Sequence, residues 1–182
     1  MIRVFSFRPE YFNQNGDQGN LEALSHFTGQ TLEQSDFDSA DFVLFGDASR
    51  AAMREFSEQL HGFVPGLQKR LDSGKPTLLV GSCYELFAPM LSGMPEFVFA
   101  ERRSEFSETT VADIEIFGYR NTEVSTPEVF VNGGFVGTVY FGPVFAKNPE
   151  LLGIVVKQLG FEVSVSQEER RWLQEIRSTI SD

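Results

Sequence analysis

The chain has 182 residues, enough for one domain with a sizeable core. Lys and Arg number 15 against 26 Asp and Glu, and the net charge of -11 argues against a surface for nucleic acid or for an anionic membrane. One cysteine and two histidines allow no internal disulfide and no Cys/His-rich zinc site. No apolar run approaches the ~20 residues of a membrane span, and the chain starts without a signal-peptide core. We therefore expect a cytoplasmic protein that binds no membrane, nucleic acid or metal.

The first half of the chain predicts strands that alternate with helices. Short runs of apolar residues predict strands at residues 2–7, 41–45 and 77–80, the last of them apolar on both faces. Helices are expected at residues 21–27, capped by Asn20, and at residues 49–60, 65–71 and 84–91. This alternation is typical of a parallel sheet with helices on both faces.

The second half has a different pattern. Between residues 97 and 140, short strand-like runs are separated by Gly, Asn and Pro, and we expect several of them to be antiparallel or at the edge of the sheet. Asn148 and Pro149 predict the cap and first position of a helix that ends near Leu159. Ser166 and Glu169 have the spacing of a capping box for a last helix, in which apolar residues 172, 173, 176 and 180 form one stripe. The prediction is one three-layer α/β domain over residues 1–182.

Ligands of open α/β sheets bind beyond the carboxyl ends of the strands. Three turns follow predicted strands, at residues 46–49, 81–83 and 141–143. The second turn is the most informative, because a strand that runs directly into a helix exposes its turn residue and directs backbone N–H groups toward it. The candidate pocket-lining residues are Gly46, Asp47, Ser49, Ser82, Cys83, Asn121 and Gly142.

Cys83 is the only candidate thiolate in the chain. Its place in the first turn of a predicted helix could lower its pKa, although a lone cysteine is more often a small buried side chain. A nucleophile also needs a base, and both histidines, His26 and His61, lie in upstream helices away from any carboxyl end of a strand. The acidic residues nearest the turns are Asp17, Asp47 and Glu85, each of which suits a turn or a helix start without any function.

Four stretches resemble one family, in the order in which the family has them. They are residues 12–20 (FNQNGDQGN), 74–80 (GKPTLLV), 118–121 (GYRN), and 137–143 (GTVYFGP) with 147–150 (KNPE). The family is the cobyric-acid-synthase-like class I glutamine amidotransferases, and within it the chain most resembles the glutaminase subunit of lipid II isoglutaminyl synthase. The resemblance implies a flavodoxin-like fold with a mostly parallel sheet and antiparallel edge strands in the second half.

The catalytic positions depart from the family pattern. The family turn reads P-x-x-x-x-C-G-G-Y-Q, and counting from Pro76 places its cysteine at Gly81, two residues before Cys83. The histidine that the family has before Gly-Pro falls on Phe141, and a second histidine falls on Thr122. Its Gly-Gly-Gly oxyanion loop falls on residues 46–48 and therefore on an aspartate. Glycine offers no nucleophile, phenylalanine no base, and an aspartate opposes an oxyanion.

We therefore favour a degenerate amidotransferase-like protein, without glutaminase activity and without a cofactor, that binds a partner or a small ligand. By resemblance, the expected partner is a ligase-type (Mur-ligase-like) protein or a second copy. The alternative is an active glutaminase in which Cys83 is a displaced nucleophile and Glu85 or Asp47 the base. A third hypothesis uses Ser82 as the nucleophile of an unrelated hydrolase. The 19 phenylalanines are expected mainly in the core.

Overall fold

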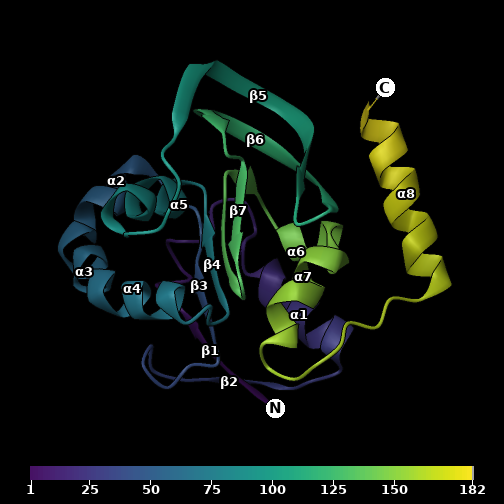
Figure 1. The fold of residues 1–182 in the computed structure, drawn as a ribbon, viewed down its shortest axis with the longest axis horizontal. Coiled ribbons are helices and arrows are strands. Elements are labelled where there is room, and N and C mark those ends of the chain that lie inside the picture. Colours follow the sequence, from purple (N-terminus) through teal and green to yellow (C-terminus); the bar gives the residue numbers. More distant parts are fainter. Residues whose placement is uncertain (182) are drawn as a thin grey trace.

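The computed structural model describes residues 1–181, with the side chains of residues 1–180. Its central sheet has six strands in the order β2-β1-β3-β4-β8-β7 (Figure 1). All neighbours are parallel except β7 and β8, which form an antiparallel hairpin. The strands are β1 (Ile2–Ser6), β2 (Leu32–Gln34), β3 (Phe42–Phe45), β4 (Thr77–Val80), β7 (Val129–Asn132) and β8 (Phe135–Thr138). The predicted α/β fold with a mostly parallel sheet is confirmed.

Helices cover both faces of this sheet (Figure 1). One layer holds α1 (Gly19–Thr28), α6 (Val144–Lys147) and α7 (Pro149–Lys157). The other holds α2 (Arg50–Glu55), α3 (Ser57–Gly62), α4 (Val64–Asp72), α5 (Ser82–Phe87) and the short 3-10 helix η1 (Ala88–Met90). Along β3, Phe42 and Leu44 face the first layer while Val43 and Phe45 face the second, as the two-residue period of a strand requires.

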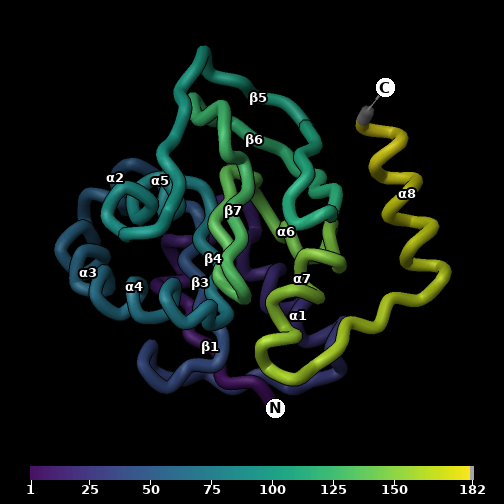
Figure 2. The backbone as a smooth tube through the Cα atoms, viewed as in Figure 1, coloured from purple at the N-terminus to yellow at the C-terminus, as the bar shows by residue number. Residues whose placement is uncertain are grey.

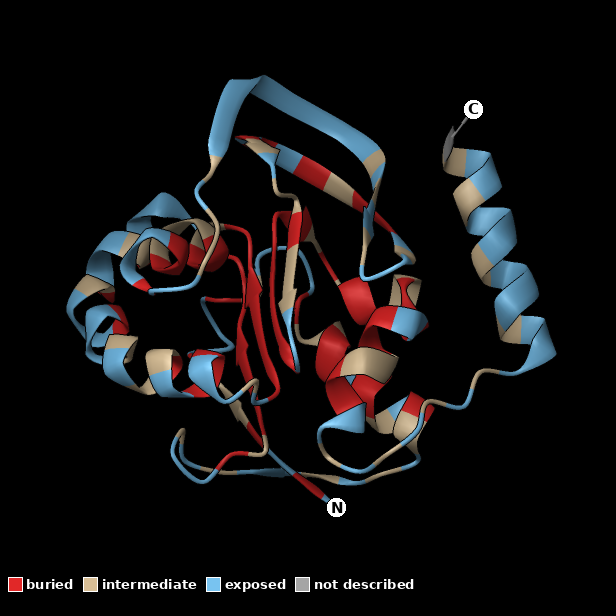
Figure 3. Ribbon diagram, viewed as in Figure 1, coloured by how far each residue is buried: buried red, intermediate tan, exposed pale blue. Residues whose placement is uncertain are grey.

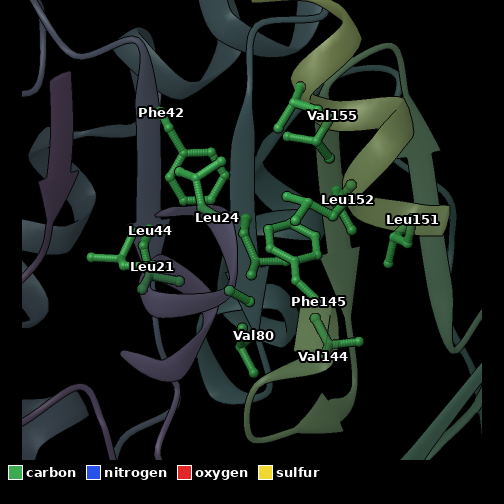
Figure 4. Close-up of a cluster of buried hydrophobic side chains, with 14 of the residues drawn as sticks. Leu21, Leu24, Phe42, Leu44, Val80, Val144, Phe145, Leu151, Leu152 and Val155 are labelled. Atoms are coloured by element: carbon green, nitrogen blue, oxygen red, sulfur yellow. The ribbon is translucent and has the colours of Figure 1, made fainter. Parts of the chain in front are cut away.

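The two layers enclose two cores. The core under α1, α6 and α7 is mainly aliphatic, with Leu24 and Leu152 beside Phe42 and Phe145 (Figure 4). The core under α2–α5 is rich in aromatic rings, and the ring centroids of Phe7 and Phe45 lie 5.3 Å apart. Of all the phenylalanines, only Phe99 and Phe106 are exposed, so the expectation that phenylalanine serves mainly the core is confirmed.

A second, antiparallel sheet has the order β5-β6-β9. Its strands are β5 (Val98–Val111), β6 (Ile114–Thr126) and β9 (Tyr140–Phe141). Ala112 and Asp113 join β5 to β6 with φ angles of 50° and 61°, as the favoured two-residue hairpin turn requires. The prediction of antiparallel strands in the second half is confirmed, but β5 and β6 are two long strands, not several short runs.

Some predicted helix ends are wrong. Asn20 lies inside α1, fully buried, and does not cap it. Asn148 precedes α7 as predicted, but its side chain makes no capping bond and instead binds the backbone N–H and C=O of Phe117. The predicted helix over residues 49–60 is divided at Phe56 into α2 and α3, while Ser49 caps α2 as expected. In each wrong case a tertiary hydrogen bond or packing contact takes the place of a local signal.

The last helix of the described residues is α8 (Gln167–Ser181), whose far end lies well away from the N-terminus (Figure 2). The predicted capping box is confirmed, because the Ser166 N–H donates to Glu169 Oε2 at 2.7 Å and the Glu169 N–H donates to Ser166 Oγ at 3.2 Å. Glu169 also contacts α1, with its Oε1 2.6 Å from His26 Nε2. Within residues 1–181, none of the helices combines the length and apolarity needed to cross a bilayer.

Candidate functional site

The β4–α5 turn is the centre of the candidate site. Strand β4 ends at Val80 and α5 begins at Ser82, so Gly81 alone makes the turn, with φ 53° and ψ -119°. This backbone conformation is strained for any residue with a Cβ and accessible to glycine. A sharp strand-to-helix turn of this kind presents the nucleophile in α/β-hydrolase elbows. The backbone at Gly81 therefore has the sharp strand-to-helix geometry of such a turn.

Two side chains fill the space that a side chain on Gly81 would need. A Cβ built there would lie 2.6 Å from Asp47 Oδ1 and 2.6 Å from Cε1 of the Phe141 ring. Asp47 follows β3 and Phe141 ends β9, so the three turns predicted from the sequence do meet. Asp47 is only 7 % exposed. No side chain can project from Gly81 unless Asp47 and Phe141 move.

Two backbone donors around the turn already have acceptors within the protein. The Ser82 N–H donates to Asp47 Oδ1 at 2.9 Å, and the Ala48 N–H donates to Ser82 Oγ at 3.0 Å. In a nucleophile elbow, the N–H of the residue after the nucleophile stabilises an oxyanion. In this chain the N–H of the residue after Gly81, that of Ser82, already has a carboxylate of the protein as its acceptor.

Asp17 connects the turn after β3 to the turn after β9. It is fully buried, and its two carboxylate oxygens accept the N–H groups of Asp47 at 2.8 Å and of Gly142 at 3.1 Å. Burial raises the pKa of Asp17 to about 7, and the Asp47 charge adds to this rise, whereas the two N–H donors and Lys147 oppose it. Asp17 thus acts as a buried brace between two of the three turns.

Two further polar side chains support the same region. Asn15 Nδ2 donates to Asp47 Oδ2 at 2.9 Å, so both oxygens of that carboxylate have a partner. Lys147 Nζ donates to the carbonyl oxygen of Phe141 at 2.9 Å, and burial lowers the pKa of this lysine. Asn15 and Lys147 were not named as candidate site residues, although they lie in two of the stretches on which the family resemblance rests, residues 12–20 and 147–150.

Cys83 lies in the aromatic core between the sheet and α2–α5. Its side chain is fully buried, in the same cluster as Tyr84 and Phe87. Burial, together with the charges of Asp47 and Asp17, raises the pKa of the thiol well above its ordinary value. The expectation that the helix start lowers this pKa is therefore wrong, because the thiol is buried and faces two carboxylates, which together raise its pKa.

The other candidate residues divide into two groups. Gly46 lies beside the β4–α5 turn, where a Cβ would collide with the Phe12 carbonyl, and Gly142 donates to the Asp17 carboxylate. Ser49 caps α2 with its hydroxyl, and Asn121 is an exposed residue of β6 whose Oδ1 accepts a hydrogen bond from Arg102 at 2.9 Å. The structure thus brings Gly46 and Gly142 to the turns and gives Ser49 and Asn121 other contacts.

Glu85 and the two histidines have partners outside the three turns. Glu85 accepts a hydrogen bond from Thr122 at 2.6 Å. His26 contacts Glu169, and His61 Nδ1 lies 2.6 Å from the Ser57 carbonyl oxygen within α3. Both histidines lie in helices on the exposed surface, as predicted. Across residues 1–181, no group of three or more His, Cys, Asp or Glu is arranged to hold a metal ion.

The fold is similar to that of a solved glutamine amidotransferase. A solved glutamine amidotransferase from Thermotoga maritima matches with a TM-score of 0.53 and 14% identity, over 87% of this chain and 83% of that protein. The solved structure of the protein SMU.1228c matches with a TM-score of 0.50 and 14% identity, over 86% of this chain and 82% of that protein. No protein-family model and no curated sequence matches the chain. The likeness therefore establishes the fold.

Proposed function

We propose that the protein is a glutamine amidotransferase-like subunit without glutaminase activity, which binds a partner protein or a small ligand. The observation that carries the proposal is the occupied β4–α5 turn, where Asp47 and Phe141 fill the space in front of Gly81. Glutamine hydrolysis requires a nucleophile, a base and oxyanion donors. Here the turn residue has no side chain, Phe141 cannot accept a proton, and Asp47 holds the Ser82 N–H.

The position of the turn supports the alignment on which the proposal rests. The residue with the left-handed backbone is Gly81, which aligns with the family cysteine, and not Cys83. Cys83 lies two residues further on, inside the hydrophobic core. Removing the nucleophile of a catalytic triad costs a factor of ~10⁶ in a well-studied serine protease. A comparable loss would leave no glutaminase turnover of biological use.

A glutaminase assay tests the inactive site. We expect the purified protein to release ammonia from glutamine at the rate of the buffer blank, with and without any ligase encoded beside it. Cys83→Ser is expected to give the same result, because the thiol lies in the core. Turnover by the wild type that Cys83→Ser abolishes would overturn the proposal in favour of the displaced-nucleophile alternative. Turnover that Ser82→Ala abolishes would favour a serine nucleophile.

Co-purification tests the binding role. By resemblance, the proposed partner is a ligase-type, Mur-ligase-like protein in the cytoplasm. We expect a tagged copy of this chain, co-expressed with a ligase encoded beside it, to retain that ligase through size-exclusion chromatography. If the two elute separately and glutamine also leaves the melting temperature of the isolated protein unchanged, the binding role fails on both counts.

A further inference from the structure

Strand β5 is an edge strand of the second sheet, and most of its residues are exposed. It pairs only with β6, and its other edge is open (Figure 3). Residues 98–106 are exposed without a break, among them Phe99 at 65% and Phe106 at 44%. A long open edge presents unpaired N–H and C=O groups on which another strand can add.

The sequence of β5 is complementary to itself about Ser104. Two identical antiparallel strands in one sheet are related by a twofold axis perpendicular to it, so paired residues lie on the same face. With the axis at Ser104, Arg103 of each copy lies opposite Glu105 of the other. Opposite charges in direct cross-strand pairs stabilise a sheet, and like charges destabilise it.

The two neighbouring registers have the opposite electrostatics. An axis at Arg103 places the two copies of that arginine face to face and puts Glu101 opposite Glu105. An axis at Glu105 places two carboxylates face to face. Charge complementarity therefore selects Ser104 among these adjacent registers.

The Arg103 and Glu105 side chains already interact within the single chain. Glu105 Oε1 accepts a hydrogen bond from the buried Arg120 at 2.8 Å, and Arg120 is itself fixed by Glu128 at 2.8 Å. Arg103 Nη1 lies 3.5 Å from Glu105 Oε1, and the two side chains are 60% and 46% exposed. Glu105 is therefore a fixed acceptor, and Arg103 is free to exchange its partner for the one across the axis.

The outer face of β5 adds a second contact in the same register. The Phe106 ring stacks on Phe117, with ring centroids 5.5 Å apart and ring planes 6° apart. With the axis at Ser104, Arg102 of the second copy comes opposite this ring. Arg102 lies where the pairing of β5 with β6 is shifted, between Phe99 and Arg103, and it would exchange its hydrogen bond to Asn121 for this contact. An arginine over an exposed aromatic face contributes a cation–π attraction.

We propose that the protein forms a twofold homodimer by antiparallel pairing of β5 with β5 of a second copy, centred on Ser104. The pairing joins the β5-β6-β9 sheet of one copy to that of the other and makes one continuous sheet. Both copies use the same surface in this interface. The dimer is tested by measuring assembly and not hydrolysis. A failure of the dimer proposal is therefore distinguishable from a failure of the proposed function.

Sedimentation analysis of charge variants is the first test. We expect the wild type to be a dimer and Arg103→Glu to weaken dimerisation by about tenfold or more, because two attractive contacts become two repulsive ones. The matched control is Arg54→Glu on α2, which makes the same charge change on an exposed residue outside β5 and should leave the dimer unchanged. A wild type that stays monomeric, or a dimer that Arg103→Glu does not weaken, would overturn the proposal.

Disulfide trapping tests the register. Ser104→Cys should cross-link two copies under mild oxidation, because the residue lies on the axis, whereas the native Cys83 is buried and does not compete. The control is Glu108→Cys, whose two copies would be separated by about 27 Å at ~3.4 Å per residue. Cross-linking at position 108 in place of 104 would show a different pairing and refute the proposed register.

Discussion

Gly81 is the residue on which the chemistry of the site depends. A methyl group there meets a carboxylate and a ring at 2.6 Å, and the backbone has φ 53°. We expect Gly81→Ala to lower the free energy of unfolding by about 2–4 kcal/mol, from left-handed strain and overpacking together. Urea unfolding measures the loss. Gly153→Ala on α7 is the control, because a Cβ there meets nothing within 4 Å.

Pairing Gly81→Ala with Asp47→Ala separates collision from strain. Because the carboxylate is one of the two groups that the new methyl would strike, the two substitutions should couple by about 1 kcal/mol or more in a double-mutant cycle. Additive effects would show that Asp47 does not obstruct the turn. Such a result would remove the observation on which the proposed function rests.

Installing the residues that the resembled amidotransferases have at these positions should create a reactive thiol. Gly81→Cys with Phe141→His alone would still meet Asp47, so the variant also needs Asp47→Gly. We expect this triple variant, built on Cys83→Ser, to be labelled by a thiol reagent in the native state. The wild type should be labelled only after unfolding, because Cys83 is buried. A triple variant that folds but resists labelling would contradict the alignment.

The sequence predicted which turns form the candidate site. It did not predict which side chains contact one another there. Parallel strands bring their carboxyl ends to one edge, so the meeting of Gly81 with Asp47 and Phe141 followed from the order of strands and turns. The direction of each side chain did not follow. Cys83 is one residue past Ser82, and its side chain lies in the aromatic core, whereas the Ser82 hydroxyl contacts the turn after β3. The brace from Asp17 joins residues far apart in sequence, a contact that no local pattern encodes.

At the scale of elements, the capping box of α8 gives a pH-dependent attachment. Hydrogen bonds from His26 and Ser166 lower the pKa of Glu169 from 4.5 to about 2. A lowered carboxyl pKa means that the attachment is fully present above pH 4.5 and is lost as the pH falls toward about 2. The anisotropy of Trp172, the only tryptophan of the chain, should therefore decrease over that range.

Glu169→Gln is the control for this titration. The amide keeps the shape of the side chain but cannot titrate, so the acid-dependent step in Trp172 anisotropy should disappear. Trp172 is 59% exposed, and its anisotropy reports mainly the motion of α8. If the variant retained the step, other carboxyl groups would hold the helix in place.

The elements that could not be predicted from the sequence are strands that form because a neighbouring strand pairs with them. Strand β2 is three residues of Leu, Glu and Gln at the sheet edge and has no apolar alternation, so only its pairing with β1 defines it. The charged residues that dominate β5 obscured a single long strand, which forms because β6 pairs with it over most of its length. Helices α1, α4 and α7 were predictable because their apolar spacing and flanking residues are local.

For the whole molecule, Asp17 should make stability fall as the pH rises. Its pKa is raised from 3.8 to about 7, so between these values the folded chain holds a proton that the unfolded chain has released. The contribution is therefore greatest below pH 3.8 and is lost as the pH rises through about 7, with a slope of about 1.4 kcal/mol per pH unit. Urea unfolding between pH 5 and 8 measures this slope.

Asp17→Asn isolates that effect from other titrations. The variant should be less stable overall by about 1–3 kcal/mol, because its amide N–H faces a backbone donor that Asp17 now satisfies. Its pH slope should be flatter than that of the wild type by the contribution of one proton. Parallel slopes would show that Asp17 is ionised throughout this range.

The contact between Asp47 and the Ser82 N–H has a thermodynamic consequence for binding by the whole molecule. A carboxylate attached to the chain next to its own donor acts as an intramolecular ligand, present at an effective concentration that a free metabolite does not reach. A ligand that needs the Ser82 N–H as a donor would first have to displace Asp47 from it. Its apparent affinity would then be its intrinsic affinity reduced by the fraction of molecules in which Asp47 is displaced, so substitutions that weaken the Asp47 contact would tighten binding without touching the ligand.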